Sequence, residues 1–186
     1  MRRPRNRCSR ALPVLALLLA PAVLVAQGRL DPLVSAADEV ALRTLIPQAD
    51  SFELVETHLR HFRAYTQSAS GGDPTLVGFA FFTTDVTPRL YAYKGRITLL
   101  VGMDTAGRLI DVQVVYHYEP FGYFSIDPPE FAAQFKNKSI LDPLEVGEDI
   151  DAVSRATITV TAATRAIRQG ARLLAREFLA EQDADK

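Results

Sequence analysis

The clearest hydrophobic pattern in the chain is an alternation that runs from Leu109 to Tyr118. A period of two residues is the pattern of a β-strand with one buried face. The preceding segment, Arg96–Met103, is rich in Ile, Leu and Val, and Asp104–Gly107 between the two has the composition of a turn. The two segments are therefore predicted to pair as an antiparallel hairpin. The alternating apolar positions are Ile110, Val112, Val114 and Tyr116.

Weaker patterns predict the remaining elements. Segments with helical periodicity and segments rich in β-branched and aromatic residues are separated by stretches of Gly, Ser, Asp and Pro. The predicted helices lie at 35–46 (capped by Ser35), 130–135 and 162–181, and the further strands at 61–67 and 76–83. This order favours an α+β fold, in which a small antiparallel sheet is packed by helices from both ends of the chain.

The first residues have the character of a targeting segment. Five arginines precede an uncharged apolar stretch at 11–26, and small residues follow up to Gly28. The stretch is shorter than the roughly 20 residues that a membrane span needs, which favours a cleaved signal over an uncleaved anchor. We therefore predict a signal peptide at 1–28 and one domain at 29–186. The protein is expected to be periplasmic or exported, with attachment to the outer face of the cytoplasmic membrane as an option.

Charge and cysteine content narrow the classes of function. From residue 29 onward the chain has 16 basic and 22 acidic residues, a net charge of −6. This balance argues against nucleic acid as a partner, because phosphate binding needs clustered cations. The one cysteine, Cys8, lies in the predicted signal. Within the predicted domain, disulfides, thiol catalysis and cysteine-bound metal clusters are therefore excluded.

Hydroxyl groups gather just before the last predicted helix. Ser154, Thr157, Thr159 and Thr161 stand close together there. The unpaired N–H groups of a helix N-terminus suit a phosphate, and a hydroxyl beside them is a possible point of esterification. In the alternative interpretation, 157–161 is a short strand and Thr159 or Thr161 is an ordinary helix cap.

Five segments of the sequence resemble, in the same order, landmarks of one known family. They are Leu45–Phe52, Tyr93–Gly107, His117–Gly122, Phe131–Lys138 and Asp151–Thr157. The last is similar to the flavinylation motif Asp-x-x-Ser/Thr-Gly-Ala-Thr. Together they resemble the FMN-binding domain shared by flavin-carrying subunits of the sodium-translocating NADH:quinone oxidoreductase and of the Rnf complex, and by the NosR-type regulators. The details around Glu119 and Ser154 are most similar to the NosR-type branch.

The resemblance implies a function and a set of site residues. Thr157 would carry FMN through a phosphoester, within a modification motif that includes Asp151, Ser154 and Ala156. Thr159 would be a neighbour of the phosphate, and Glu119 and Gly122 would lie in the loop that faces the flavin. A flavin transferase that uses FAD and magnesium would attach the FMN outside the cytoplasmic membrane. The product would be an electron carrier that depends on membrane or cytochrome redox partners and is not a self-sufficient enzyme.

One residue departs from the motif. Arg155 stands where the family has glycine, and glycine permits backbone conformations that arginine tolerates poorly. Three interpretations follow: the backbone has an ordinary φ at this position, the arginine pairs with the phosphate, or the transferase rejects the site. In the last case the protein would be a flavin-free binding or regulatory module on the same fold. A hydrolase is disfavoured, since the sequence shows no convincing pair of nucleophile and base.

Other side chains leave two interpretations open. His117 and Glu119 would serve a proton relay beside a flavin or lie on a solvated strand face. The aromatic residues would pack on the isoalloxazine ring or form the core of a long loop. The arginines would dock a partner or form an exposed face. The aromatic set is Tyr116, Tyr118, Phe121, Tyr123 and Phe124; the arginine set is Arg165, Arg168, Arg172 and Arg176.

Overall fold

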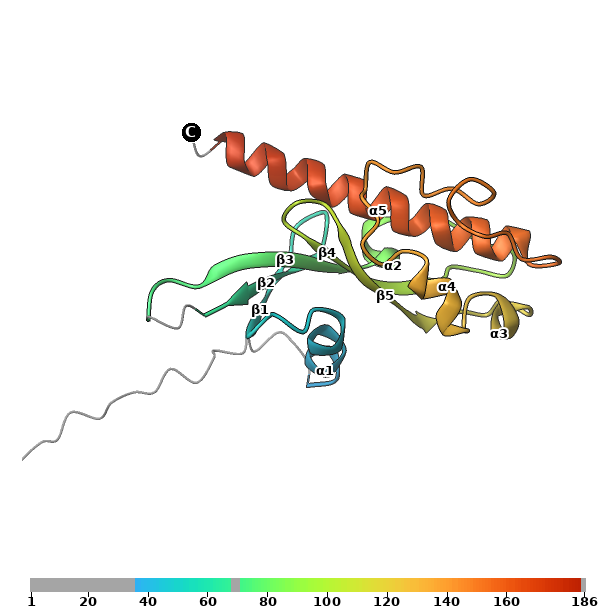
Figure 1. The fold of residues 1–186 in the computed structure, drawn as a ribbon, viewed down its shortest axis with the longest axis horizontal. Coiled ribbons are helices and arrows are strands. Elements are labelled where there is room, and N and C mark those ends of the chain that lie inside the picture. The colour runs from blue at the N-terminus through green and yellow to red at the C-terminus, as the bar shows by residue number, and fades with distance from the viewer. Residues whose placement is uncertain (1–35, 68–70, 185–186) are drawn as a thin grey trace, which may run out of the picture.

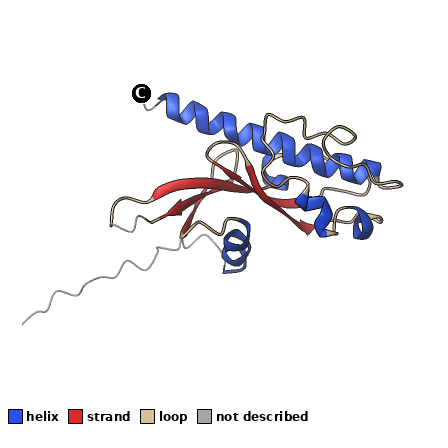
Figure 2. Cartoon of the chain, viewed as in Figure 1, coloured by secondary structure: helices blue, strands red, loops and turns tan. Residues whose placement is uncertain are grey.

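One antiparallel sheet organises the chain. A computed structural model describes residues 36–67 and 71–184, and in this part the sheet has five strands in the order β1-β2-β3-β4-β5 (Figures 1 and 2). The predicted α+β class is confirmed. The elements are α1 (Ala36–Leu45), β1 (Ser51–Val55), β2 (His61–Thr66), β3 (Thr75–Phe82), α2 (Thr83–Val86), β4 (Thr98–Asp104), β5 (Leu109–Tyr116), α3 (Gly122–Ser125), α4 (Pro129–Ala133) and α5 (Thr157–Ala184).

Helices cover both faces of the sheet. Along β4, Leu99, Val101 and Met103 belong to the core beneath α5, whereas Leu100 belongs to a second core beneath α1. Successive residues of a strand point to opposite faces, so the two cores lie on opposite sides of the sheet. Figure 1 shows α5 and α1 on these two sides. The expectation of one buried face is therefore wrong, because α1 buries the second face.

The alternation in β5 is interrupted by a register shift. Val112 pairs with Val101 and Leu109 with Met103, which leaves Ile110 as an extra residue between paired positions. Such a bulge interrupts the alternation of side chains between the two faces of the sheet. Ile110 therefore packs against the α1 core and Val112 lies in the α5 core, although residues two positions apart in a regular strand share one face.

The predicted elements are mostly confirmed, with two corrections. The predicted strands at 61–67 and 76–83, the hairpin and the first helix are present. The strand β1 was not predicted. The last helix begins at Thr157 and not near Ala162. The proposed cap Ser35 and the predicted signal peptide lie outside the described residues.

The arginines of α5 do not form one exposed stripe. Arg168 pairs with Glu145 (3.0 Å), and Arg172 donates hydrogen bonds to the carbonyl oxygens of Ile140 (2.8 Å) and Asp142 (2.8 Å). Both side chains hold the long segment before α5 against the helix. Arg165 and Arg176 are exposed. The interpretation of all four as a solvated face is therefore wrong for two of them.

The described helices carry no membrane span. Within residues 36–67 and 71–184, none of them combines the length and the apolar character needed to cross a bilayer.

Asp50 links the start of β1 to the end of β2, and this contact predicts an acid-dependent loss of stability. Its Oδ2 accepts hydrogen bonds from the Gln67 backbone N–H (2.8 Å) and the Thr66 hydroxyl (2.9 Å). These bonds hold the pKa of Asp50 below its ordinary value. A carboxylate whose pKa is lower in the folded state than in the unfolded state stabilises the fold at pH values above the ordinary carboxyl range. This stabilisation is lost as the pH falls through the folded-state pKa.

We expect Asp50→Asn to lower the urea midpoint at pH 7 and to lie closer to wild type at pH 3, below the ordinary carboxyl range, where this carboxyl is already protonated in the unfolded chain. The measurement is urea unfolding of both proteins at the two pH values. A gap of the same size at both would contradict the role assigned to the carboxylate.

Candidate functional site

A tight turn at residues 153–156 immediately precedes α5. The Ala156 N–H donates to the Val153 carbonyl oxygen (3.1 Å), which closes a four-residue turn over Ser154 and Arg155. Arg155 has φ of 68°, in the left-handed region, whereas Ser154 is not among the residues with positive φ. This is the pattern of a type II turn, whose third residue is normally glycine or asparagine. The interpretation that the site uses an ordinary φ at Arg155 is therefore wrong.

The first turn of α5 presents free backbone donors. The helical ladder begins with the Val160 N–H, which donates to the Ala156 carbonyl oxygen (3.0 Å). The N–H groups of Thr157, Ile158 and Thr159 precede that bond and have no acceptor within the helix. Thr157 is the first helical residue, and its side chain is exposed. The alternative that 157–161 is a strand is therefore contradicted.

Glu119 connects three segments around this helix end. The side chain is buried, with 6% exposed. Its Oε2 accepts from the Thr159 hydroxyl (2.6 Å) and the Tyr93 N–H (3.3 Å), and its Oε1 accepts from the Lys94 N–H (2.7 Å). The interpretation of Glu119 as a solvated strand residue is wrong. The carboxylate instead ties the 93–94 segment to the first turn of α5.

His117 packs beneath the loop that carries Glu119. Its Nδ1 accepts from the Glu119 N–H (3.0 Å), so its Nε2 carries the hydrogen and donates to Asp127 Oδ1 (2.7 Å). The His117 ring lies against Gly122, where any side chain would collide with it. Gly122 thus acts by leaving room for the imidazole, and the loop from 117 to 127 is held from both ends.

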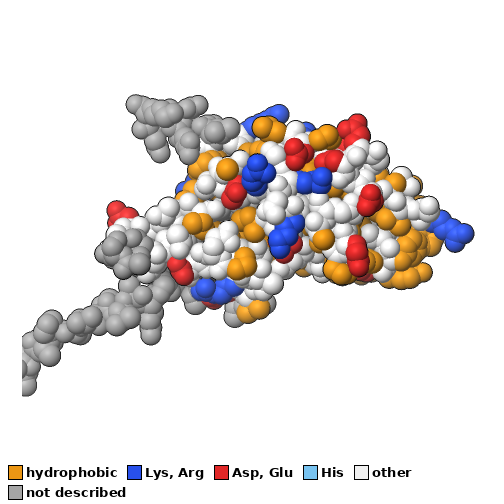
Figure 3. Space-filling model, in the orientation of Figure 1, with side chains coloured by type: hydrophobic (Ala, Val, Ile, Leu, Met, Phe, Trp, Pro, Cys, Tyr) orange, Lys and Arg blue, Asp and Glu red, His pale blue; other side chains and the backbone are white. Residues whose placement is uncertain are grey.

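Four of the five aromatic residues between the end of β5 and α3 lie on the surface. The interpretation that these side chains form the core of a loop is wrong for four of them, because more than two fifths of each side chain's surface is exposed. Phe124, the fifth, packs against the α5 core. Figure 3 shows hydrophobic side chains gathered at the end of the molecule that holds α3. A hydrogen bond with Tyr118 raises the pKa of Tyr116 above its ordinary value. The exposed four are Tyr116, Tyr118, Phe121 and Tyr123.

Two hollows meet at Thr157. One has a volume of about 320 Å³ and is lined by Tyr93, Phe121 and residues 155–159. The other has about 290 Å³ and is lined by Leu90, Tyr91 and the opposite side of the first turns of α5. Both include Thr157 and Ile158. Thr157 therefore stands at the junction of two surface depressions with aromatic walls.

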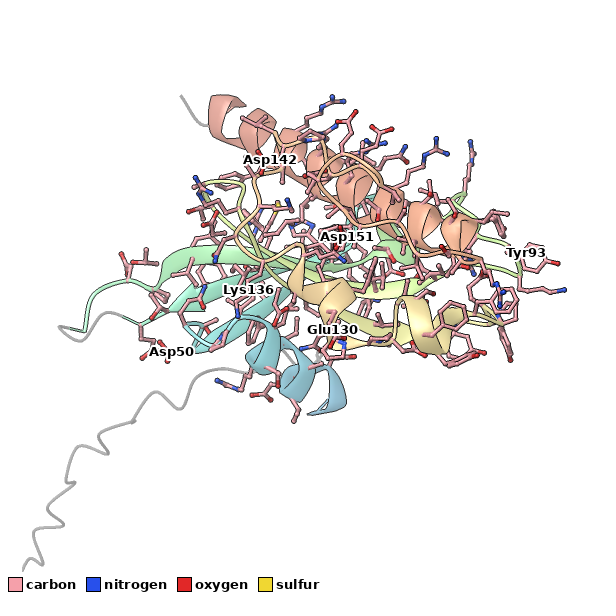
Figure 4. All side chains as sticks on the ribbon, turned by 45° about the vertical axis from the view of Figure 1, so that its right-hand side comes forward. Asp50, Tyr93, Glu130, Lys136, Asp142 and Asp151 are labelled. Carbon is pink, nitrogen blue, oxygen red and sulfur yellow. The ribbon has the colours of Figure 1, made fainter. Side chains whose placement is uncertain are left out.

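The structure brings together some of the residues that the sequence singled out. Ala156, Thr157 and Thr159 line the 320 Å³ hollow, and Glu119 bonds to Thr159. Ser154 is exposed in the turn and lines neither hollow. Asp151 is exposed, and in Figure 4 it lies toward the middle of the molecule, whereas Tyr93 stands at the end where α5 begins.

Some contributors are not among the predicted site residues. The backbone N–H groups of Tyr93 and Lys94 hold Glu119, and Asp127 holds His117. Ile158 is 61% exposed at the junction of the hollows. The Tyr-x-Gly landmark at 93–95 marks the first of these segments in the sequence. No sequence signal indicates that its N–H groups bind a carboxylate.

Comparison with protein families identifies the class of this site. Residues 92–172 match the model of the FMN-binding domain, a span that runs from the Tyr93 segment through β4, β5 and the site into α5. This part of the chain belongs to the FMN-binding domain family, and the protein is a flavin-binding protein. A search of curated proteins gives no match.

The left-handed Arg155 leads to a test of the turn. A non-glycine residue in this conformation costs roughly 1–2 kcal/mol, partly offset by the extra freedom that glycine has in the unfolded chain. We expect Arg155→Gly to stabilise the protein by about 0.5–1 kcal/mol, seen as a small rise in the thermal midpoint. The matched control is Arg89→Gly, an exposed arginine for which no positive φ is found. A lower midpoint for Arg155→Gly would contradict the strained turn.

Proposed function

We propose that this protein is an exported electron carrier that holds FMN covalently through a phosphoester to Thr157. The observation that supports this best is the position of Thr157. This residue is exposed, it belongs to the first turn of a long helix, and it lines a hollow with aromatic walls inside an FMN-binding domain.

The residues present fit the cofactor. The phosphate of FMN would lie at the free N–H groups of the first turn of α5, where the helix dipole favours an anion. The isoalloxazine ring would occupy the 320 Å³ hollow, a volume within the usual range of small-molecule sites. Tyr93 and Phe121 would contact the ring, since aromatic faces pack well on a flat conjugated system.

Covalent attachment requires a second protein. In the proposed reaction the Thr157 Oγ attacks the FMN-side phosphorus of FAD, and a new Oγ–P bond forms. The P–O bond of the pyrophosphate breaks, AMP leaves, and the hydroxyl proton passes to a base of the flavin transferase. The exposure of Thr157, Ser154 and Asp151 supports this assignment, because a transferase must reach the modified residue and the motif around it.

Export and redox partners complete the proposal. The arginine-rich, apolar leader at 1–28 supports export, and a covalent tether would keep FMN from diffusing away outside the cytoplasm. The bound flavin would supply the electron-transfer chemistry, while the protein retains, orients and tunes it. Membrane or cytochrome partners would provide and accept the electrons, with the carrier periplasmic or at the outer face of the membrane.

The test is intact mass of the protein after export from cells that also express a flavin transferase. We expect a gain of one FMN less one water, located by peptide mapping on Thr157, and a yellow colour that survives denaturation. An unmodified mass, with a control substrate flavinylated in the same cells, would overturn covalent attachment.

A second candidate is a binding or regulatory module without covalent flavin. The observation that favours it is Arg155, which occupies a left-handed position that the motif reserves for glycine. Under this alternative the transferase rejects the turn, and Arg155→Gly would convert an unmodified protein into a flavinylated one. Modification of the unaltered chain would exclude it.

A further inference from the structure

A groove extends from the candidate flavin site along α5. Its largest hollow, of about 580 Å³, lies between the segment after α2 and one side of α5. This hollow shares Leu90 and Arg165 with the 290 Å³ hollow, which in turn meets the proposed flavin site at Thr157 and Ile158. The three hollows adjoin one another through these shared lining residues and are called here the α5 groove. A partner seated in this groove would lie beside the flavin.

The charged residues of the α5 groove are mainly cations. Arg89, Arg155 and Arg165 line it and are exposed, and the described structure gives none of them an ion pair. The acidic residue of the lining, Asp85, already binds Arg60 (3.2 Å). The lining therefore carries three exposed arginines against one acidic residue, which already has a cationic partner.

This concentration of positive charge contrasts with the rest of the chain. From residue 29 onward acidic residues outnumber basic ones by 22 to 16. Several other cations in the described part are held by acids, such as Arg43 by Glu39 (2.8 Å) and Lys138 by Asp149 (3.3 Å). Uncompensated cations beside the flavin, in a mainly acidic protein, favour a partner with negative charge.

The rim of the α5 groove also has the composition of a protein interface. Tyr91 is 66% exposed, Ile158 61% and Leu173 38%. Exposed tyrosine, arginine and large apolar residues are enriched where proteins bind each other, and contiguous apolar surface is uncommon on monomers without such a role.

We propose that the α5 groove is the docking surface for an electron-transfer protein that carries acidic residues around its own cofactor. The inference rests on the proposed function, because it requires the flavin at Thr157. Arg89 and Arg165 would steer the partner toward the groove and place its acidic rim against the helix, while the exposed apolar residues exclude water from the contact. Opposite charges raise association rates at low salt and lose this effect as salt increases.

The first test uses two acceptor proteins of opposite charge. Acidic plastocyanin and basic cytochrome c each take one electron, so two acceptors are reduced for each fully reduced flavin and two protons pass to solvent. With the flavinylated, photoreduced protein at low ionic strength, we expect plastocyanin to react at least tenfold faster than cytochrome c. Arg89→Gln/Arg165→Gln should remove most of this preference, and high salt should remove it in both proteins.

The matched control is Arg43→Gln/Arg108→Gln, which removes the same charge from residues that line none of the three hollows. It should keep the preference for plastocyanin. Equal rates with both acceptors, or an equal loss of preference in both double variants, would overturn the docking surface. Intact mass of each variant shows first that its flavin content matches wild type.

A second readout needs no flavin, so the failure of the proposed function can be told apart from the failure of this inference. Hexacyanochromate(III), an inert paramagnetic anion, is titrated into the isotope-labelled, unflavinylated protein. We expect amide signals around Leu90, Arg165 and Gln169 to broaden, and this broadening to disappear in Arg89→Gln/Arg165→Gln. Broadening centred elsewhere would overturn the proposal that the α5 groove binds an anionic partner, whether or not the protein carries flavin. A dimer that dissociates on the same substitutions would assign the groove to a second copy and overturn the proposal as well.

Discussion

Thr157→Ala is expected to abolish covalent flavin completely, because the proposed phosphoester has no other suitable oxygen. Thr159 lies two residues further along the helix, but its hydroxyl is buried and donates to Glu119 (2.6 Å). Thr161 is exposed and lines the adjoining hollow, yet it follows the first turn, where backbone N–H groups are already bonded within the helix. Thr157 alone among these threonines combines an exposed hydroxyl with the free donors that suit a phosphate.

The experiment compares three variants by intact mass and by absorbance after denaturation. Thr157→Ala should show no bound flavin, Thr157→Ser should keep it because the hydroxyl remains, and Thr161→Ala should match wild type. Circular dichroism confirms that α5 is intact in each. Flavin that persists in Thr157→Ala and maps to Ser154 or Thr161 would refute Thr157 as the attachment point.

The hairpin and the first helix could be predicted because their signals are local. Asp104–Gly107 has the chemistry of a turn, with the Asp104 carboxylate accepting from the N–H groups of Ala106 (2.9 Å) and Arg108 (2.8 Å). Pro47 follows α1 closely, as expected for a helix stop. Each of these signals acts within a few residues, so the sequence contains all the information that the element needs.

The start of α5 could not be predicted because tertiary contacts override local preference there. Residues 157–161 are all β-branched, which favours a strand. Val160 is buried in the α5 core, and Thr159 is bound by Glu119 from another loop. These contacts, together with the turn at Arg155, place the segment in the first turn of the helix. The resemblance to a family predicted the role of the segment, but not its conformation.

Both the orientation of Glu119 and the strain at Arg155 required the structure. The donors to Glu119 are backbone groups of residues 93 and 94, about 25 positions earlier in the chain, and no sequence pattern reports such a contact. At Arg155 the motif shows that glycine is usual, but the structure supplies the reason, a φ of 68°. In both cases the missing information is a backbone geometry and not a residue type.

Glu119→Ala is expected to be among the most destabilising substitutions near the site, by about 3 kcal/mol. The buried carboxylate accepts from Thr159, Tyr93 and Lys94, and its removal leaves these donors without their acceptor. An unsatisfied buried donor costs about 1–3 kcal/mol. Glu119→Gln keeps one acceptor oxygen but turns an N–H₂ group toward a donor, so we expect a loss of about 1–2 kcal/mol.

Urea unfolding of these variants measures the effect, with Glu130→Gln as the matched control. Glu130 is an exposed glutamate in the first turn of α4, and its substitution should change stability by less than about 0.5 kcal/mol. A double-mutant cycle with Thr159→Val isolates the shortest contact, and a coupling of about 1–2 kcal/mol is expected.

The second readout is the rate of flavinylation at Thr157, measured on the folded fraction of wild type and of each Glu119 variant. If Glu119 contributed only to overall stability, this rate would be the same in all of them. Because Glu119 fixes the Tyr93 segment against the first turn of α5, its loss should slow attachment and leave the aromatic wall of the hollow poorly placed. If Glu119→Gln matched Glu130→Gln in both stability and attachment rate, the carboxylate would not be what holds the site together.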